Sequence, residues 1–364
     1  MFAKMKAAAA AAAVLSGVML SGIGVFGLSA GAALAKETIK VGICVSWPGY
    51  SFYQVVKEKN LAPDYDIQQT IFEDPVGGHS ALAAGQIDVF YCTNDYSPIA
   101  VEQNTDEVNV TYTSPSYGVD QIALAPKTEP KDLKGKKIAA PQAYIGQLLM
   151  GVWLDSQGIK TNDVQWVNLN ADEAIGPMIS GDLAAAYVYE PWLSKLIAAQ
   201  PGARSVTNTA DPEILKTGIF MDVIYMNKSF IAKNRKAALD MLKAHFLAVQ
   251  AWHDDTAGVN QIFADYLKWP IEDVQGVIGT NGKFLKGGVY VFDFDEAARV
   301  CGVLDGDAPL GLKNGAAYDA MALINSWWQK LGLMKTTIDP KKAMDCTLMA
   351  DLVKAGFRQS IKEH

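Results

Sequence analysis

The sequence has few of the residues and motifs that mark a catalytic or metal centre. Its 364 residues include four cysteines and four histidines, and no two cysteines have the Cys-x-x-Cys spacing of a zinc or redox site. Beyond residue 35 there is no Gly-x-Ser-x-Gly, Walker or Gly-x-Gly-x-x-Gly motif. We therefore expect no enzyme activity, no catalytic residue, no metal and no cofactor. His245 and His253 leave a metal site open as an alternative to a solvated helix end.

Positive charge is also in short supply. The chain has 32 Lys and Arg against 39 Asp and Glu, a net charge of −7. This balance argues against nucleic acid and anionic membrane surfaces as partners. After residue 35 no apolar run reaches the length of a membrane span, so we expect a soluble mature protein.

The first 35 residues have the pattern of a secretory signal peptide. Lys4 and Lys6 form a positive start, the stretch from Ala7 onward carries no charge, and Ala33-Leu34-Ala35 is a small-x-small cleavage site. We expect cleavage near Ala35. The uncharged run is also long enough for an uncleaved membrane anchor, which stays open as an alternative.

Export makes disulfides permissible, and four cysteines allow three full pairings. Cys44 and Cys92 both fall at predicted strand ends in the same half of the chain, whereas Cys301 and Cys346 lie in the C-terminal third. The first two are candidates for neighbours. Free buried cysteines remain the alternative, because a chain of this size needs no covalent staple.

The stretch from Gly181 to Trp192 is the clearest candidate for a strand that leads into a ligand site. Gly181 ends a helix, residues 183–188 form a short buried strand, and a turn carrying Tyr189, Glu190 and Trp192 follows. Ligands of α/β sheets bind beyond the carboxyl ends of strands, so this turn is placed to face a small ligand. Residues 85–91 repeat the same order of glycine, apolar strand and polar or aromatic residues.

Strands alternate with helices along most of the chain, which predicts α/β lobes with parallel-rich sheets. The predicted strands are 38–45, 65–73, 87–91, 108–112, 121–125, 136–141, 164–169, 183–188 and 217–226. After Asn227 the pattern is helical, ending in a predicted helix over 344–362. We expect lobe 1 to comprise 36–124 and 223–364, lobe 2 to comprise 125–222, and a ligand cleft to lie between them.

Four motifs in this order resemble the substrate-binding proteins of nitrate/sulfonate/taurine-type ABC importers. They are Ser46-Trp47-Pro48-Gly49-Tyr50, Ala81 to Val89, Pro130 to Ala139, and Gly181 to Trp192. The resemblance covers most of residues 38–260. It implies a two-lobed periplasmic binding fold of type II character, in which the lobes hinge closed on a solute.

The same resemblance implies a periplasmic monomer that hands its solute to an ABC permease and its ATPase at the inner membrane. Two other roles stay open. The family is also similar to the binding proteins and synthases of the thiamine pyrimidine precursor, which include enzymes. A tethered sensor domain would require the N-terminal apolar segment to persist in the mature protein.

Acidic and aromatic side chains dominate the candidate ligand contacts. They are Trp47, Tyr50, Asp74, Asp95, Tyr144, Tyr189, Glu190, Trp192 and Asp222. Asp222 interrupts an apolar strand and resembles the acid that faces the amine in taurine-type binders. Carboxylates walled by aromatic rings suit a cation, so we expect an amine, amidine or guanidinium solute.

Other interpretations of these residues stay open. Asp74 and Asp95 are equally well explained as caps or solvated charges, and Glu190 as a brace of its turn. Helix starts at Gly77-Gly78-His79-Ser80 and at Tyr144-Ile145-Gly146-Gln147 suit an anion instead. Taurine, another aliphatic sulfonate, or nitrate is therefore the alternative ligand.

Overall fold

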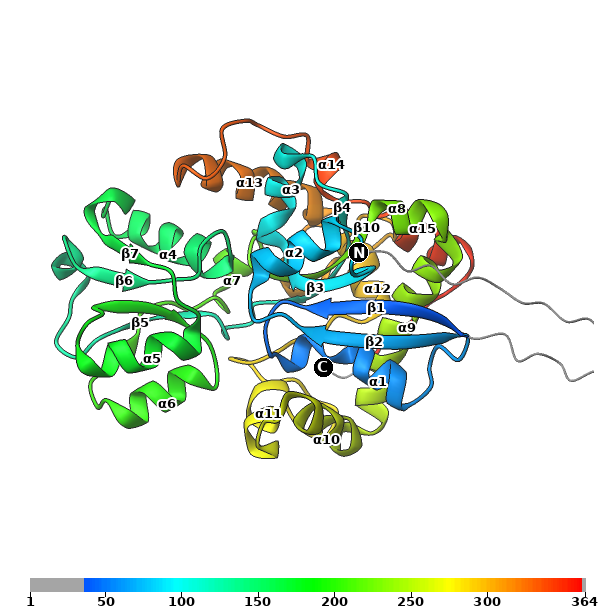
Figure 1. The fold of residues 1–364 in the computed structure, drawn as a ribbon, viewed down its shortest axis with the longest axis horizontal. Coiled ribbons are helices and arrows are strands. Elements are labelled where there is room, and N and C mark those ends of the chain that lie inside the picture. The colour runs from blue at the N-terminus through cyan, green and yellow to red at the C-terminus, as the bar shows by residue number, and fades with distance from the viewer. Residues whose placement is uncertain (1–35, 362–364) are drawn as a thin grey trace, which may run out of the picture. The chain divides into compact units, whose positions relative to one another are not determined.

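The computed structural model describes residues 36–361 of the unit Lys36–His364. The predicted signal peptide and its cleavage site fall outside the described residues. Figure 1 shows two groups of strands within this unit. The first sheet has the order β2-β1-β3-β10-β4 and the second the order β7-β6-β8-β5-β9. The mixed α/β fold with two helix-flanked sheets confirms the predicted fold class.

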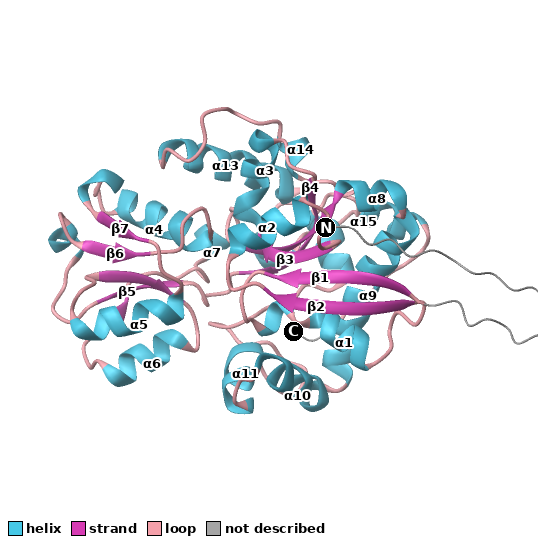
Figure 2. Ribbon diagram, viewed as in Figure 1, coloured by secondary structure: helices cyan, strands magenta, loops and turns pink. Residues whose placement is uncertain are grey.

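The first sheet consists of β1 (Glu37–Ile43), β2 (Tyr65–Ile71), β3 (Val89–Thr93), β4 (Glu107–Pro115) and β10 (Met221–Asn227). β1 runs parallel to both β2 and β3, and β10 pairs antiparallel with β3 and β4. β3 and β4 are buried along their whole length, because helices cover the sheet (Figure 2). Burial on both faces explains the continuous apolar run of β3, whereas β4 alternates apolar and polar residues although all of them are buried.

The second sheet consists of β5 (Gln121–Leu124), β6 (Lys137–Ala139), β7 (Gln165–Val167), β8 (Ala185–Val188) and β9 (Arg204–Ser205). The predicted lobe boundary placed Gln121–Leu124 in lobe 1. Its backbone instead pairs antiparallel with β8, from Gln121↔Val188 to Leu124↔Ala185. Asp222, predicted at the end of lobe 2, lies in β10 of the first sheet. The chain therefore crosses between the sheets through residues 116–120 and again between β9 and β10.

Helices flank both sheets, and the longest is α9 at 20 residues. The helices before β10 are α1 (Phe52–Glu58), α2 (Pro75–Ala83), α3 (Ser97–Gln103), α4 (Ile145–Ser156), α5 (Ala171–Ser180), α6 (Trp192–Ala199) and α7 (Pro212–Leu215). The later ones are α8 (Lys228–Lys233), α9 (Arg235–Asp254), α10 (Thr256–Leu267), α11 (Ile271–Ile278), α12 (Phe294–Val300), α13 (Ala316–Lys330), α14 (Pro340–Ala343) and α15 (Thr347–Lys354). No helix within 36–361 is long and apolar enough to cross a membrane.

Two predicted segments differ in extent from the observed helices. The helix expected to start at Gly77–Ser80 begins earlier, because Pro75 occupies the first turn of α2, where its missing N–H costs no hydrogen bond. The predicted helix over 344–362 is much shorter, ending at Lys354. Gly356 follows with φ of 81°, a left-handed conformation that stops a helix.

Two disulfides join the four cysteines. Cys44 pairs with Cys92 at a Cα–Cα distance of 5.3 Å, and Cys301 pairs with Cys346 at 5.9 Å. The first pair follows from the register of the sheet, because Ile43 lies opposite Tyr91 on neighbouring parallel strands. The predicted neighbourhood of Cys44 and Cys92 is confirmed, and the free-thiol alternative is wrong.

Candidate functional site

A cavity lies where the strand ends of the two sheets meet. Its walls come from the segment after β1, the end of β3, the crossing between β4 and β5, β8 and the residue after it, β10, and the start of α4. The lining residues are Val45, Trp47, Tyr50, Thr93, Ser116, Val119, Asp120, Tyr144, Tyr187, Tyr189 and Asp222. Five of these eleven are aromatic and two are acidic, and none is basic.

The cavity is small. Its unfilled space measures about 330 Å³ including the opening to solvent, but the centre of a water molecule can occupy only about 20 Å³ of it. A single water needs roughly 10–15 Å³ on this measure. In this conformation the site therefore has room for a solute of only a few heavy atoms.

Five of the nine predicted site residues line this cavity: Trp47, Tyr50, Tyr144, Tyr189 and Asp222. Trp47 and Tyr50 follow β1, where Pro48–Tyr50 forms a 3₁₀ turn. Tyr189 follows β8, and its ring meets that of Trp47 edge-on at 5.6 Å between centroids. β1 and β8 thus deliver aromatic residues from both sheets to one place, as expected for strand carboxyl ends.

Asp222 is held by donors on both of its carboxylate oxygens. The Tyr50 hydroxyl donates to Oδ1 and the Ser114 hydroxyl to Oδ2, each at 2.7 Å. The side chain of Trp47 also hydrogen-bonds to it. Burial, with a smaller contribution from the neighbouring Asp120 charge, raises the pKa of Asp222 to about 7 despite these donors. A cation in the cavity would therefore stabilise the ionised form.

Asp120 is a second acid in the cavity wall, and the sequence reasoning missed it. It lies in the crossing between β4 and β5 and accepts a hydrogen bond from the Tyr187 hydroxyl. The residues around it in the sequence form no motif that marks a ligand site. Burial raises the pKa of its carboxyl group. Tyr187 was assigned to a strand interior, yet its ring also faces the cavity. The one usable signal was an acid in a short segment between two apolar strands.

Asp95 lies close to this pair without lining the cavity. It is 1% exposed, and neither of its carboxylate oxygens has a hydrogen-bond partner in the described part of the chain. Burial, with smaller contributions from the charges of Asp120 and Asp222, raises the pKa of Asp95 to about 7. Within residues 36–361, none of these three carboxylates takes part in an ion pair. They form an acidic cluster without basic partners.

The structure places three predicted residues away from the cavity. Asp74 is exposed at the start of α2, where its backbone carbonyl accepts from the Gly78 amide. The Glu190 carboxylate accepts from the backbone N–H of Ser194 at 3.2 Å, which braces the start of α6. Trp192 is half-buried, with the Lys195 ammonium 4.6 Å from its ring centroid.

The histidines considered as metal ligands have other contacts. His245 is buried against the Tyr91 hydroxyl, and burial lowers its pKa to about 3. The Nδ1 atom of His253 lies 2.9 Å from the Gly282 carbonyl oxygen. In the described part of the chain, no three or more His, Cys, Asp or Glu side chains are grouped to hold a metal ion.

Comparison with known proteins bears on the class of this site. The model of the NMT1-like family matches residues 97–266. A binding protein of Brucella abortus is 24% identical over 208 residues, covering 56% of this chain and 63% of the relative. The chain thus spans less than two thirds of that relative. The taurine-binding periplasmic protein of Escherichia coli is 24% identical over 232 residues, 61% of this chain and 68% of its own.

Solved structures share the fold at lower identity. The alkanesulfonate-binding protein of Xanthomonas axonopodis pv. citri superposes with a TM-score of 0.65 at 18% identity, covering 85% of this chain and 99% of its own. The periplasmic nitrate-binding protein of Synechocystis PCC 6803 gives 0.65 at 15% identity, covering 88% and 89%.

The fold is therefore that of the two-lobed periplasmic binding proteins. The predicted resemblance to nitrate/sulfonate/taurine-type substrate-binding proteins is confirmed by the family model, the relatives and the structures together. These relatives and structures are named for binding and not for catalysis.

Proposed function

We propose that this chain is the periplasmic solute-binding component of an ABC importer, and that its solute is a small nitrogen-containing cation. The solute class is an amine, amidine or guanidinium. The resemblance supports the role as a carrier. We therefore propose a permease and its ATPase as partners, and a monomer without enzyme activity. The cationic class rests on one observation: Asp120 and Asp222 line a cavity that has no basic side chain.

Charge decides between the ligand classes. A nitrate or alkyl sulfonate would sit against two carboxylates with no Lys or Arg to offset them, which like-charge repulsion disfavours. A cation would gain charge-assisted hydrogen bonds from the carboxylates. It would also gain about 0.5–2 kcal/mol from each well-placed aromatic face. The small space favours a compact cation over an extended one.

Taurine is the second candidate, and two observations support it. A relative is a taurine-binding protein, and taurine carries an ammonium group that can donate a hydrogen bond to the Asp222 carboxylate. Tyr144, at the cavity, is the N-cap of α4 and makes no side-chain capping bond, so the first backbone N–H groups of α4 are available to an anion. An alkyl sulfonate without an amine, or nitrate, could bind the N–H groups at this helix end, but it would offer no positive group to Asp120 and Asp222.

A thermal-shift panel on the exported protein tests the proposal. The panel contains methylammonium, guanidinium, taurine, methanesulfonate and nitrate at millimolar concentration, with sodium chloride as the ionic-strength control. Binding raises the melting temperature by mass action, so we expect shifts with the small cations and none with methanesulfonate or nitrate. Shifts with the anions alone would overturn the cationic class. A shift with taurine alone would select the second candidate.

A further inference from the structure

We propose that the Cys44–Cys92 disulfide is a positioning element of the solute site, so that breaking it weakens solute binding. This inference rests on the proposed binding function and concerns the same cavity. The second disulfide, Cys301–Cys346, lies outside the cavity wall and provides a control within the same molecule.

The disulfide joins the carboxyl ends of two strands that supply the cavity. Cys44 follows β1, and its backbone N–H donates to the Tyr91 carbonyl of β3 at 3.0 Å. The next residue after each cysteine, Val45 after Cys44 and Thr93 after Cys92, lines the cavity. The covalent bond therefore fixes the spacing between Val45 and Thr93, because each of them is bonded directly to one of the two cysteines.

The disulfide also touches the opposite wall. The Sγ atom of Cys44 lies 3.9 Å from the hydroxyl oxygen of Tyr144, which lines the cavity at the start of α4. Cys44 and Cys92 are 0% and 1% exposed, so the surrounding wall covers them in this conformation. A change in the sulfur positions would reach residues contributed by both sheets.

Reduction supplies the chemical switch. A thiolate of an added dithiol attacks one sulfur of the disulfide, which breaks the protein S–S bond and releases the other cysteine as a thiolate. The second thiolate of the dithiol then attacks the mixed disulfide and releases the first cysteine, and both cysteine thiolates take up protons. The dithiol is oxidised by two electrons, and Cys44 and Cys92 each end as a thiol. The two released sulfurs are no longer held at bonding distance, so Val45 and Thr93 lose their fixed spacing.

The test compares two double variants, Cys44→Ser/Cys92→Ser and Cys301→Ser/Cys346→Ser. The disulfides close loops of similar length, with sequence separations of 48 and 45, so their removal should lower the melting temperature to a similar degree. The dissociation constant is measured for whichever solute of the panel shifts the parent. We expect at least roughly tenfold weaker binding in the first variant and less than about twofold change in the second.

Equal dissociation constants in the two variants would overturn the inference, because a merely structural bond affects stability without affecting affinity. If the first variant does not fold, the parent is reduced with dithiothreitol, and alkylation of each cysteine pair is followed by mass spectrometry. We expect bound solute to slow reduction of Cys44–Cys92 at least about fivefold and to leave Cys301–Cys346 unchanged. Equal protection of both contradicts the inference. If the parent binds a sulfonate instead, the cationic class fails while this comparison still stands.

Discussion

At the scale of single residues, affinity should depend most on Asp222. Its carboxylate faces the cavity and is oriented by hydroxyl donors from Tyr50 and Ser114. Orientation by fixed donors leaves the remaining lone pairs directed at the solute without rearrangement. The same donors would be left partly unsatisfied in a variant that lacks the charge.

We predict that Asp222→Asn weakens cation binding roughly 10- to 150-fold, because a hydrogen bond to a charged group is worth about 1.5–3 kcal/mol. Asp74→Asn is the matched control, since Asp74 is exposed and away from the cavity. Calorimetric titration of both variants measures the difference. If Asp222→Asn binds as tightly as the parent, Asp222 is not a ligand contact.

The pH dependence follows from the same carboxylate. The pKa of Asp222 is raised from 3.8 to about 7, so between these values the native state keeps a proton that the unfolded state has lost. The free energy of unfolding should therefore fall as pH rises through this window, and less steeply in Asp222→Asn. A cation competes with that proton, so affinity should rise roughly 10- to 30-fold from pH 5.5 to pH 8. Affinity that is flat or falling over this range would contradict the prediction.

Sequence reasoning found the site residues that follow the predicted strands. Trp47 and Tyr189 stand directly beyond buried apolar runs, so topology placed them correctly. Asp120 gave no such signal, because a crossing segment has no periodicity and its partner Tyr187 is far away in the sequence. Asp74 and Glu190 are acids like Asp222, and only the folded structure separates an exposed acid and one that braces a helix start from the one that faces a cavity.

At the scale of elements, the start of α4 matters because it brings Tyr144 to the cavity. Gly146, in the first turn, lies against the Tyr187 ring, where an added Cβ would come within 2.5 Å of a ring carbon. The side chain of Tyr187 in turn donates to Asp120. The packing of this helix end on β8 therefore sets the position of one acid and two aromatic rings.

Gly146→Ala should displace Tyr187 or α4 and weaken solute binding by roughly tenfold, with a loss of stability of about 1–3 kcal/mol from overpacking. Gly176→Ala in α5 is the control, because nothing lies within 4 Å of its added Cβ. Alanine there should leave affinity unchanged and raise stability by up to about 1 kcal/mol. Comparable affinities in the two variants would show that the start of α4 does not shape the site.

Nine of the ten described strands and most helices could be predicted from hydrophobic pattern and glycine position, whereas the two-residue strand β9 was missed. The partner of a short strand could not. Gln121–Leu124 is an apolar run like those of the first sheet, and only its backbone pairing with β8 and β9 assigns it to the second. The lobe limits themselves stay a prediction apart from this strand and the placement of Asp222 in β10.

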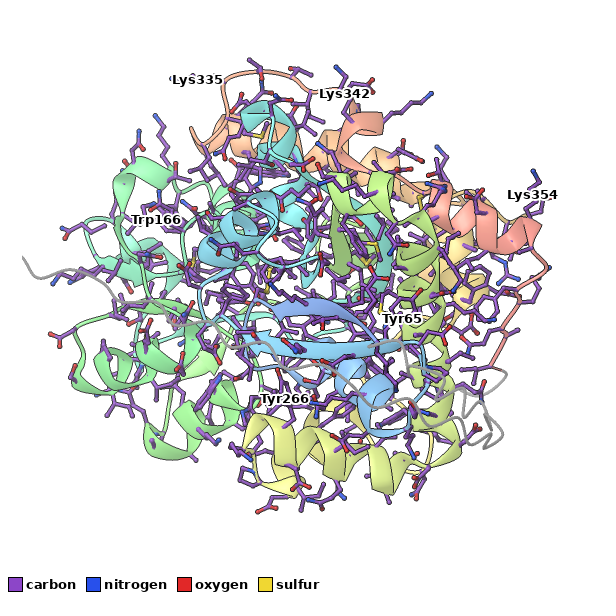
Figure 3. All side chains as sticks on the ribbon, turned by 45° about the vertical axis from the view of Figure 1, so that its right-hand side comes forward. Tyr65, Trp166, Tyr266, Lys335, Lys342 and Lys354 are labelled. Carbon is purple, nitrogen blue, oxygen red and sulfur yellow. A yellow bond between two sulfur atoms is a disulfide. The ribbon has the colours of Figure 1, made fainter. Side chains whose placement is uncertain are left out.

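At the scale of the whole Lys36–His364 unit, contacts outside the cavity join the elements around the two sheets. Lys195 of α6 pairs with Asp273 of α11 at 2.9 Å, and Lys330 of α13 pairs with Asp155 of α4 at 2.6 Å. Other lysines, such as Lys335, simply point outward from the surface (Figure 3). We infer that these pairs form only when the two sheets approach, and that they favour the proposed conformation that encloses the solute.

Lys195→Ala should weaken solute binding by no more than about fivefold, because an exposed ion pair is worth about 0–1 kcal/mol. The effect should shrink as salt is raised to about 1 M, where screening is strong. Lys313→Ala is the control: its pair with Asp319 is also exposed and lies within the C-terminal segment. Equal affinity changes for the two variants, independent of salt, would rule out a role of the Lys195 pair in closure.

The central claim is that an acidic, aromatic-walled cavity holds a small cation. Calorimetric titration of the exported protein with guanidinium, methylammonium, taurine and methanesulfonate at pH 8 tests it most directly. We predict saturable one-to-one binding of at least one of the two small cations and no heat of binding with methanesulfonate. Saturable binding of methanesulfonate, with both cations silent, would contradict it.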